Sequence, residues 1–259
     1  MSILLGQGIE NKLVIVTGAA SGIGFETALM FDKVGAKVAA IDINKEGLDT
    51  LSSQLSNNEH EFIQQDLSKI DEVSSLVKSL SGNDKNLWAL IHPAAYLKRQ
   101  STSEVTEEDW DAQMSVNLKA SFFLARACGD IMKEQDKGGR IILFTSGAWL
   151  MGSAMGDTSM GADVYTASKG GVVSIIRSFA KTYGKYNILV NAIAPGQVNT
   201  PMQHIGLEPG ISEEMSKACP LGRVSEPQEQ ASVAVFLASE HASFINNSVI
   251  NVSGGILGY

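Results

Sequence analysis

Several residue types and patterns are scarce in this chain, and each scarcity excludes a class of protein. Only 2 of the 259 residues are cysteine, too few for a disulfide framework and without the spacing of a metal site, so we expect no metal and a reducing compartment, the cytoplasm. Lys and Arg number 20 against 28 Asp and Glu, which argues against nucleic acid or an anionic membrane as a partner. The longest apolar-leaning run, IILFTSGAWLMGSAMG, is shorter than a bilayer span, and the N-terminus lacks the basic start of a signal peptide.

What the chain does contain is an alternation of short apolar runs with longer amphipathic segments. The apolar runs predict buried strands at 12–17, 38–41, 61–64, 87–91, 140–145, 187–192 and 248–252. The longer segments predict helices at 22–34, 45–56, 70–80, 107–133, 164–183 and 226–238. This alternation is typical of an α/β fold, a single-domain, Rossmann-like doubly wound parallel sheet with helices on both faces, over residues 1–259. We interpret the irregular stretches near 147–162 and 196–215 as loops inserted over the site.

A glycine-rich turn follows the first predicted strand. In TGAASGIG, Gly18, Gly22 and Gly24 stand between that strand and the first predicted helix. Missing side chains let an anion approach the backbone closely, and the helix N-terminus favours negative charge, so the turn predicts a dinucleotide pyrophosphate site. Taken alone, the same letters would also fit a tight structural turn.

An acidic residue closes the second predicted strand. Asp42, in VAAIDIN, is placed to accept hydrogen bonds from both adenosine ribose hydroxyls and to repel a 2′-phosphate. This favours NAD over NADP, although Lys45 leaves NADP as the weaker alternative. A helix N-cap or turn aspartate is the structural interpretation.

The stretch VYTASKGG places a phenol and an ammonium one helical turn apart. Tyr165 and Lys169, at i and i+4, lie on one face of the predicted helix. Oxidising a secondary alcohol requires a base for its proton, and a nearby cation lowers a tyrosine pKa toward a useful range. We therefore expect Tyr165 to act as general acid and base, with Lys169 lowering its pKa.

The pairing of TGxxxGxG with YxxxK resembles the short-chain dehydrogenase/reductase family, classical type, over most of the chain. The resemblance implies a catalytic set of Asn117, Ser146, Tyr165 and Lys169, in which Asn117 relays a proton from Lys169 to water and Ser146 binds the substrate oxygen. It implies a homotetramer, and we expect the apolar tail GGILGY to reach a neighbouring subunit. Cofactor contacts are expected, besides Tyr165 and Lys169, at Gly18, Ser21, Gly22, Ile23, Gly24, Asp42, Asp66, Leu67, Pro93, Ala94, Ala95, Pro195, Gly196, Val198 and Thr200.

Two departures from the family pattern stand out. Where the family usually has NNAG, this chain has HPAA, so the backbone there differs in detail, since Pro93 has no N–H and Ala95 disfavours positive φ. We interpret His92 as a packed histidine, with a substrate or relay role as the alternative. Ser146 and Tyr165 are 19 positions apart, farther than usual. Ser153 has the more usual spacing but lies within the inserted loop.

The substrate itself is left open by the sequence. Trp149 and nearby methionines (Met151, Met155, Met160, Met202, Met215) suit an apolar substrate, whereas Asp157, Thr158, Gln197 and His204 suit a polyol or sugar. We take Trp149, Ser153, Gln197 and His204 as substrate-lining candidates. The expected protein is an NAD-dependent dehydrogenase of a secondary alcohol or sugar hemiacetal. The alternatives are an NADP-dependent 3-oxoacyl-thioester ketoreductase and a non-catalytic dinucleotide sensor.

Overall fold

The structure is a computed structural model that describes residues 5–56, 59–82, 86–152, 161–205 and 213–258. Seven parallel strands form one sheet in the order β3-β2-β1-β4-β5-β6-β7. Their bounds are β1 Leu13–Thr17, β2 Lys37–Asp42, β3 Glu61–Gln64, β4 Leu87–His92, β5 Gly139–Phe144, β6 Ile188–Pro195 and β7 Val249–Val252. The predicted doubly wound α/β fold is confirmed, with every predicted strand in place.

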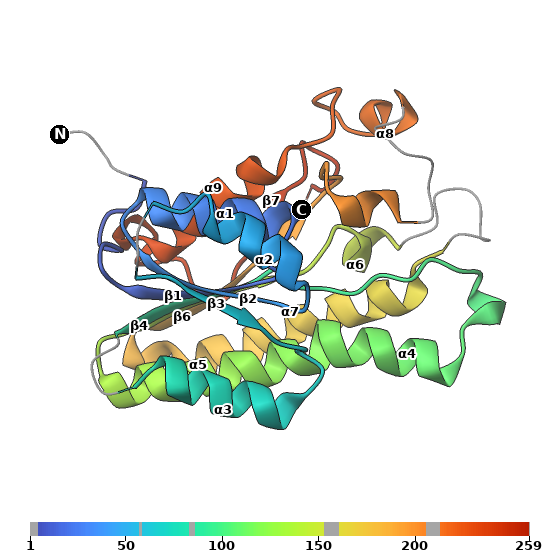
Figure 1. Cartoon of the computed structure of the whole chain (residues 1–259). Coiled ribbons are helices and arrows are strands. Elements are labelled where there is room, and N and C mark those ends of the chain that lie inside the picture. The colour runs from blue at the N-terminus through green and yellow to red at the C-terminus, as the bar shows by residue number, and fades with distance from the viewer. Residues whose placement is uncertain (1–4, 57–58, 83–85, 153–160, 206–212, 259) are drawn as a thin grey trace.

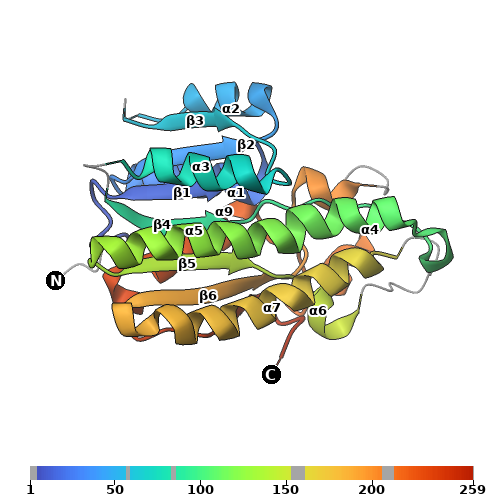
Figure 2. The same ribbon diagram turned by 90° about the horizontal axis from the view of Figure 1, so that it is seen from below.

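Helices cover both faces of the sheet (Figures 1 and 2). One face carries α1 (Gly22–Lys33), α2 (Lys45–Ser52) and α9 (Pro227–Ala238), and the other carries α3 (Ile70–Leu80), α5 (Ala120–Gln135) and α7 (Asp163–Tyr183). The central strands β1, β4, β5 and β6 are buried along their whole length, which explains their unbroken apolar runs.

The chain order reverses beside β1. From β1 the strands run outward to β2 and β3, and the chain then returns to place β4 on the other side of β1. Ligands of open α/β sheets bind at such a switch point, beyond the carboxyl ends of the strands. The loops after β1 and β4 are therefore the first place to look for a site.

Helical segments differ from prediction in two places. The predicted helix 107–133 consists of α4 (Glu107–Met114), a π-helical turn at Ser115–Lys119 and α5. Single π-turns widen a helix locally and occur often at functional sites, and this one carries Asn117. The predicted helix 45–56 ends earlier, at Ser52.

Short helical elements and the chain end complete the fold. Two short α-helices, α6 (Ala148–Met151) and α8 (Glu213–Lys217), were not predicted. No helix in the described ranges has the length and apolarity that crossing a membrane demands. In the tail, Leu257 is buried in its own chain, and its backbone N–H donates to the Ser253 hydroxyl at 3.1 Å. This residue of the tail packs on its own chain, and the reach of the tail toward a neighbouring subunit stays a prediction.

Candidate active site

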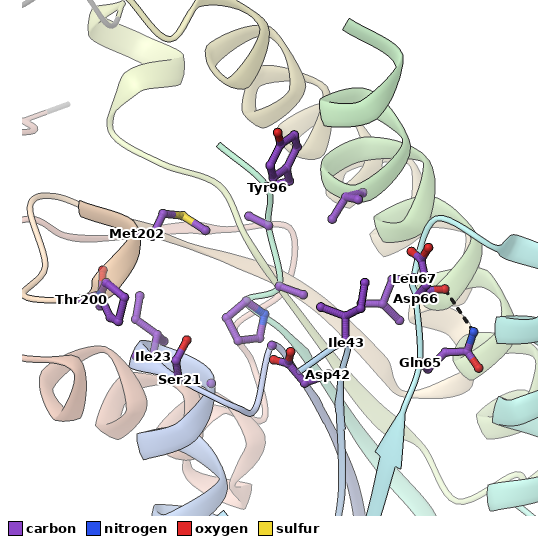
Figure 3. Close-up of a pocket in the computed structure, with 18 residues that line it drawn as sticks. Ser21, Ile23, Asp42, Ile43, Gln65, Asp66, Leu67, Tyr96, Thr200 and Met202 are labelled. Carbon is purple, nitrogen blue, oxygen red and sulfur yellow. Dashed lines mark hydrogen bonds between the residues drawn. The ribbon is translucent and has the colours of Figure 1, made fainter. Parts of the chain in front are cut away.

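A cavity of about 340 Å³ opens beyond the carboxyl ends of β1, β2, β3 and β4 (Figure 3). Most of the predicted cofactor residues line it: Gly18, Ser21, Gly22, Ile23, Gly24, Asp42, Asp66, Leu67, Pro93, Ala94, Ala95 and Thr200. Its wall also contains Met202, which the sequence suggested as an apolar substrate contact, and five residues that the sequence did not single out: Ile43, Gln65, Tyr96, Val116 and Pro201. Apart from their position next to predicted residues, these five carry no motif by which they would have been found.

The floor of this cavity is made by backbone. Gly18 has φ +61°, and a Cβ placed on it would lie 2.9 Å from the Ala94 Cα. A Cβ on Gly24 would lie 2.0 Å from the carbonyl oxygen of Gly18. Only glycine fits at these two positions, because the turn after β1 packs directly against the chain after β4 and against the start of α1. The missing side chains leave the N-terminus of α1 open toward the cavity.

The Asp42 carboxylate lies at one side of the cavity and is fixed by backbone donors. Its Oδ2 accepts from the Ala20 N–H at 3.0 Å, and its Oδ1 accepts from the Asn44 N–H at 2.8 Å. Asp42 lines the cavity together with Ser21 (Figure 3). Both oxygens retain lone pairs that can accept hydroxyl groups of a ligand.

The adjacent acidic residue, Asp66, is held in the same way. Its Oδ1 accepts from the backbone N–H and the hydroxyl of Ser68, at 2.9 and 2.7 Å. Thr200 approaches from the opposite side of the cavity, at the start of the short helix η5 (Pro201–His204). These contacts place polar oxygen atoms on two sides of an otherwise apolar wall.

Tyr165 and Lys169 lie on α7, next to the end of β5. Lys169 is almost completely buried, and its Nζ donates to the Phe144 carbonyl at 2.9 Å. The Thr145 hydroxyl donates to the Lys169 carbonyl at 2.7 Å, which ties the helix to the strand end. The Lys169 Nζ is 5.5 Å from the centroid of the Tyr165 ring. The predicted i, i+4 pair therefore lies together, with a half-buried Tyr165 beside a buried Lys169.

Ser146 follows β5 and faces the same tyrosine. Its hydroxyl acts on the Tyr165 phenol and lowers the pKa of that group. Its Oγ accepts from the Ala148 N–H at 3.2 Å, at the start of α6. The structure thus brings Ser146, Tyr165 and Lys169 together. Ser153, the other serine considered, lies outside the described residues.

The pKa values of this pair differ from our expectation. Burial raises the pKa of Tyr165, with the Ser146 hydrogen bond and the charge of Arg99 acting in the opposite direction. Burial also lowers the pKa of Lys169 to about 8. Lys169 was expected to lower the Tyr165 pKa, but its ammonium donates to the Phe144 carbonyl and does not contribute to the shift of Tyr165, which burial dominates.

Asn117 lies in the π-turn and bridges to the chain after β4. Its Nδ2 donates to the Tyr96 carbonyl at 2.9 Å and to the Ser168 hydroxyl at 3.1 Å, and its Oδ1 accepts from the Tyr96 N–H at 2.7 Å. Both side-chain N–H groups are used, and neither contacts Lys169. This arrangement positions Tyr96 and α7, while the predicted proton relay stays a prediction.

His92 ends β4 and is buried. A 2.7 Å hydrogen bond joins its Nδ1 to the Thr17 hydroxyl, and its buried Nε2 has no hydrogen-bond partner among the described residues. Burial and the nearby Lys169 charge lower the pKa of His92 to about 3, so the imidazole is neutral. His92 is thus the packed histidine that we expected. In the same HPAA stretch, Ala95 does not have a positive φ.

Other candidates lie apart from the cavity. Gly196 packs against the Ser253 backbone, and Pro195 and Val198 are buried beside it. Gln197, a substrate-lining candidate, lies instead at a second cavity of about 260 Å³, together with Cys219 and the Arg223–Glu229 ion pair. Trp149 lies on α6, and His204 ends η5 next to the cavity wall.

The residues at the cavity fit a nicotinamide dinucleotide. The glycine floor leaves a helix N-terminus open to a pyrophosphate, and Asp42 offers acceptors for ribose hydroxyls. Tyr165 and Lys169 stand where the strands β4 and β5 end. Fold and site together define an oxidoreductase that uses NAD or NADP.

Comparison with known proteins identifies the family. A sequence model described as enoyl-(acyl carrier protein) reductase matches residues 18–257. The 3-oxoacyl-[acyl-carrier-protein] reductase FabG of Thermotoga maritima is 34% identical over 252 residues, covering 96% of this chain and 99% of its own. The chain belongs to the classical short-chain dehydrogenase/reductase family, as the motifs predicted.

Two further relatives show the range of the family. The NAD-dependent glycerol dehydrogenase of Listeria innocua is 31% identical over 250 residues, 95% of this chain and 94% of its own. The crystal structure of gox2181 superposes with a TM-score of 0.86 at 28% identity, covering 95% of this chain and 96% of that one. Relatives at similar identity thus carry the names of a thioester reductase and a polyol dehydrogenase.

Proposed function

We propose that this protein is an NAD-dependent dehydrogenase that interconverts a secondary alcohol, in a polyol or a sugar hemiacetal, with its carbonyl. The observation that carries the proposal is the position of Tyr165: its ring centroid lies 5.5 Å from the Nζ of the buried Lys169, and that Nζ is held at the end of β5 by the Phe144 carbonyl. A phenol placed where the strands next to the cofactor cavity end is suited to take a proton from an alcohol.

Each residue has a separate task in this reaction. In the oxidation direction, Ser146 orients the substrate hydroxyl and Tyr165 takes its proton. The Lys169 ammonium, held by the Phe144 carbonyl beside the Tyr165 ring, is placed to hold the nicotinamide ribose. A nicotinamide bound in the cavity would accept a hydride from the carbinol carbon. In the reduction direction Tyr165 returns the proton to the carbonyl oxygen.

The preference for NAD is proposed from Asp42. A carboxylate fixed by two backbone donors cannot turn away from a 2′-phosphate, and its charge would repel one. The Listeria innocua relative, an NAD-dependent glycerol dehydrogenase, agrees with this assignment.

The second candidate function is reduction of a 3-oxoacyl thioester with NADP. The FabG relative, which is 34% identical, favours it by name. The fixed Asp42 carboxylate counts against this second function, because NADP carries the 2′-phosphate that Asp42 would repel.

The test is a substrate panel with both cofactors. Reduction of NAD and NADP is followed by absorbance with alditols, aldoses, cyclic alcohols and 3-hydroxyacyl thioesters, with wild type and Asp42→Ser. We expect turnover of a polyol or sugar with NAD, and a change of preference toward NADP in the variant. Turnover confined to thioesters with NADP in the wild type would establish the second candidate instead.

A homotetramer is part of the proposal. Large apolar side chains are exposed on α4 and α5, at Trp110 and Phe122, and after η6 (Glu240–Ala242), where Phe244 is completely exposed. Apolar groups of this size on the surface commonly mark contacts between subunits. Light scattering should give four times the 27.6 kDa chain mass, and a monomer would contradict this.

A further inference from the structure

An arginine whose buried Nε has no hydrogen-bond partner among the described residues lies on a segment beside the helix of the proposed catalytic tyrosine. Arg99 belongs to the segment between β4 and η1 (Thr102–Glu104), and its buried Nε has no hydrogen-bond partner in the described ranges. Within those ranges no carboxylate forms an ion pair with it. The residue that follows it, Gln100, is hydrogen-bonded to Gly161 just before the start of α7, so Arg99 belongs to a segment beside the helix that carries Tyr165, and its charge acts on the Tyr165 phenol.

The neighbouring cation, Lys98, differs from Arg99 because its charged group has a partner. Lys98 is exposed, and its Nζ forms an ion pair with Asp109. Its backbone N–H donates to the Gln113 side chain at 3.2 Å. Two consecutive cations thus differ: Lys98 turns to solvent and to a carboxylate, whereas Arg99 turns inward to no described partner.

The segment that carries Arg99 is fixed at both ends. Before Arg99, the side chain of Asn117 holds both backbone polar groups of Tyr96. After it, the Gln100 N–H donates to the Gly161 carbonyl at 3.0 Å, and the Thr102 hydroxyl donates to Asp163 at the start of α7. The segment therefore runs beside the helix end that carries Tyr165 (Figure 1). Arg99 is held in place by its backbone and not by an ion pair.

A buried donor without an acceptor destabilises a fold, and it is kept where a ligand supplies the acceptor. We infer that Arg99 binds an anionic group of the substrate, a carboxylate or a phosphate monoester, so that the substrate is a hydroxy acid or a phosphorylated alcohol. The inference rests on the proposed function and narrows it. Nε and one Nη of arginine present two parallel N–H groups, which match two oxygens of either anion. The redox step is unchanged: a hydride passes from the carbinol carbon to NAD, and Tyr165 takes the hydroxyl proton.

The kinetic test compares substrates that differ only in charge. Alditols, the aldonates of the same chain length and the corresponding alditol phosphates are assayed with wild type, Arg99→Gln and the matched control Lys98→Met. We expect wild type and Lys98→Met to prefer an anionic member, and the aldonate and phosphate arms tell which one. Arg99→Gln should lose about 10- to 100-fold in kcat/KM on that member, mainly through KM, and little on the neutral alditol. Equal losses on charged and neutral members, or a wild type that prefers the alditol, would overturn the inference.

A binding experiment separates this inference from the proposed reaction. Aldonates and alditol phosphates are titrated by calorimetry into wild type and Arg99→Gln, each saturated with NADH. Binding to wild type that is lost in Arg99→Gln supports the anion site even if no compound is turned over, in which case only the proposed reaction fails. Equal binding, or none to either protein, counts against the site. Should Arg99→Gln not fold, Arg99→Lys keeps the charge without the fork and is expected to bind the anion with intermediate affinity.

Discussion

The two ends of the site are built from different kinds of atoms. The end beyond β1 and β2 is formed mainly by backbone: it has a glycine floor and an open helix N-terminus. Its one carboxylate, Asp42, is held by two backbone N–H groups. The end beyond β4 and β5 is made of side chains: Ser146 and Tyr165 are half-buried beside the buried Lys169. Backbone can bind a ligand shared by a whole family, whereas selectivity and proton transfer require side chains. Substitutions at the two ends should therefore fail in different ways.

The largest expected effect is at the side-chain end. Tyr165→Phe keeps the ring and removes the proton-transfer group, so kcat should fall by about 10²- to 10⁴-fold. The affinity for NADH, measured by fluorescence titration, should stay close to that of wild type. Tyr186→Phe, in the short helix η4 (Gly184–Tyr186) that follows α7, is the control and should keep full activity. A variant that lost NADH affinity together with kcat would mean that the two ends are not separable.

The next effect is at the backbone end. Gly24→Ala puts a methyl group 2.0 Å from the Gly18 carbonyl oxygen, which forces the glycine turn to move. We expect a loss of about 1–3 kcal/mol in the free energy of unfolding and weaker NADH binding. Gly170→Ala, on α7 where an added methyl group meets nothing within 4 Å, should instead stabilise by about 0.5–1 kcal/mol. Denaturant unfolding of both variants checks this pair, and equal losses would contradict the steric argument.

The backbone end of the site was accessible from the sequence because its signals are local. Glycine spacing, the strand before it and Asp42 after the next strand all lie within one βαβ unit, and the structure gathers these residues around one cavity. The strands were found for a similar reason, since a strand buried on both faces has an unbroken apolar run. Local patterns of this kind need no knowledge of distant packing.

The side-chain end was found only in part because it depends on contacts between distant segments. The i, i+4 spacing located Tyr165 and Lys169, but it did not show that Lys169 would face the Phe144 carbonyl. The bond between Asn117 and Tyr96 depends on a π-turn that composition does not reveal. Arg99 belongs to no motif, and its importance comes from the absence of a partner among the described residues. Such features arise from packing of segments far apart in sequence.

A smaller effect is expected at the border between the two ends, where His92 joins β4 to Thr17. The pKa of about 3 in the folded protein lies below the ordinary 6.5, so the unfolded chain takes up the proton first. This contribution to stability is therefore present above pH 6.5 and is lost as the pH falls toward 3, with a slope of up to about 1.4 kcal/mol per pH unit. The stability difference between wild type and His92→Asn should thus change by about 1.4 kcal/mol between pH 7.5 and 5.5. Replacement of the exposed His241 by Asn is the control, and a pH-independent difference for His92→Asn would contradict the argument.

The smallest effect compares two helix caps. Asn44 accepts from the Gly47 N–H at 3.2 Å at the start of α2, and Thr106 accepts from the Asp109 N–H at 3.1 Å at the start of α4. Asn44→Ala and Thr106→Ala should each cost about 0.5–2 kcal/mol of unfolding free energy. Only Asn44 also donates its backbone N–H to Asp42, so loosening the start of α2 should raise the KM for NAD in Asn44→Ala and leave it unchanged in Thr106→Ala. If both caps changed the KM for NAD equally, the backbone end would not be the local unit described above, because a disturbance at α4 would have reached Asp42 through the sheet.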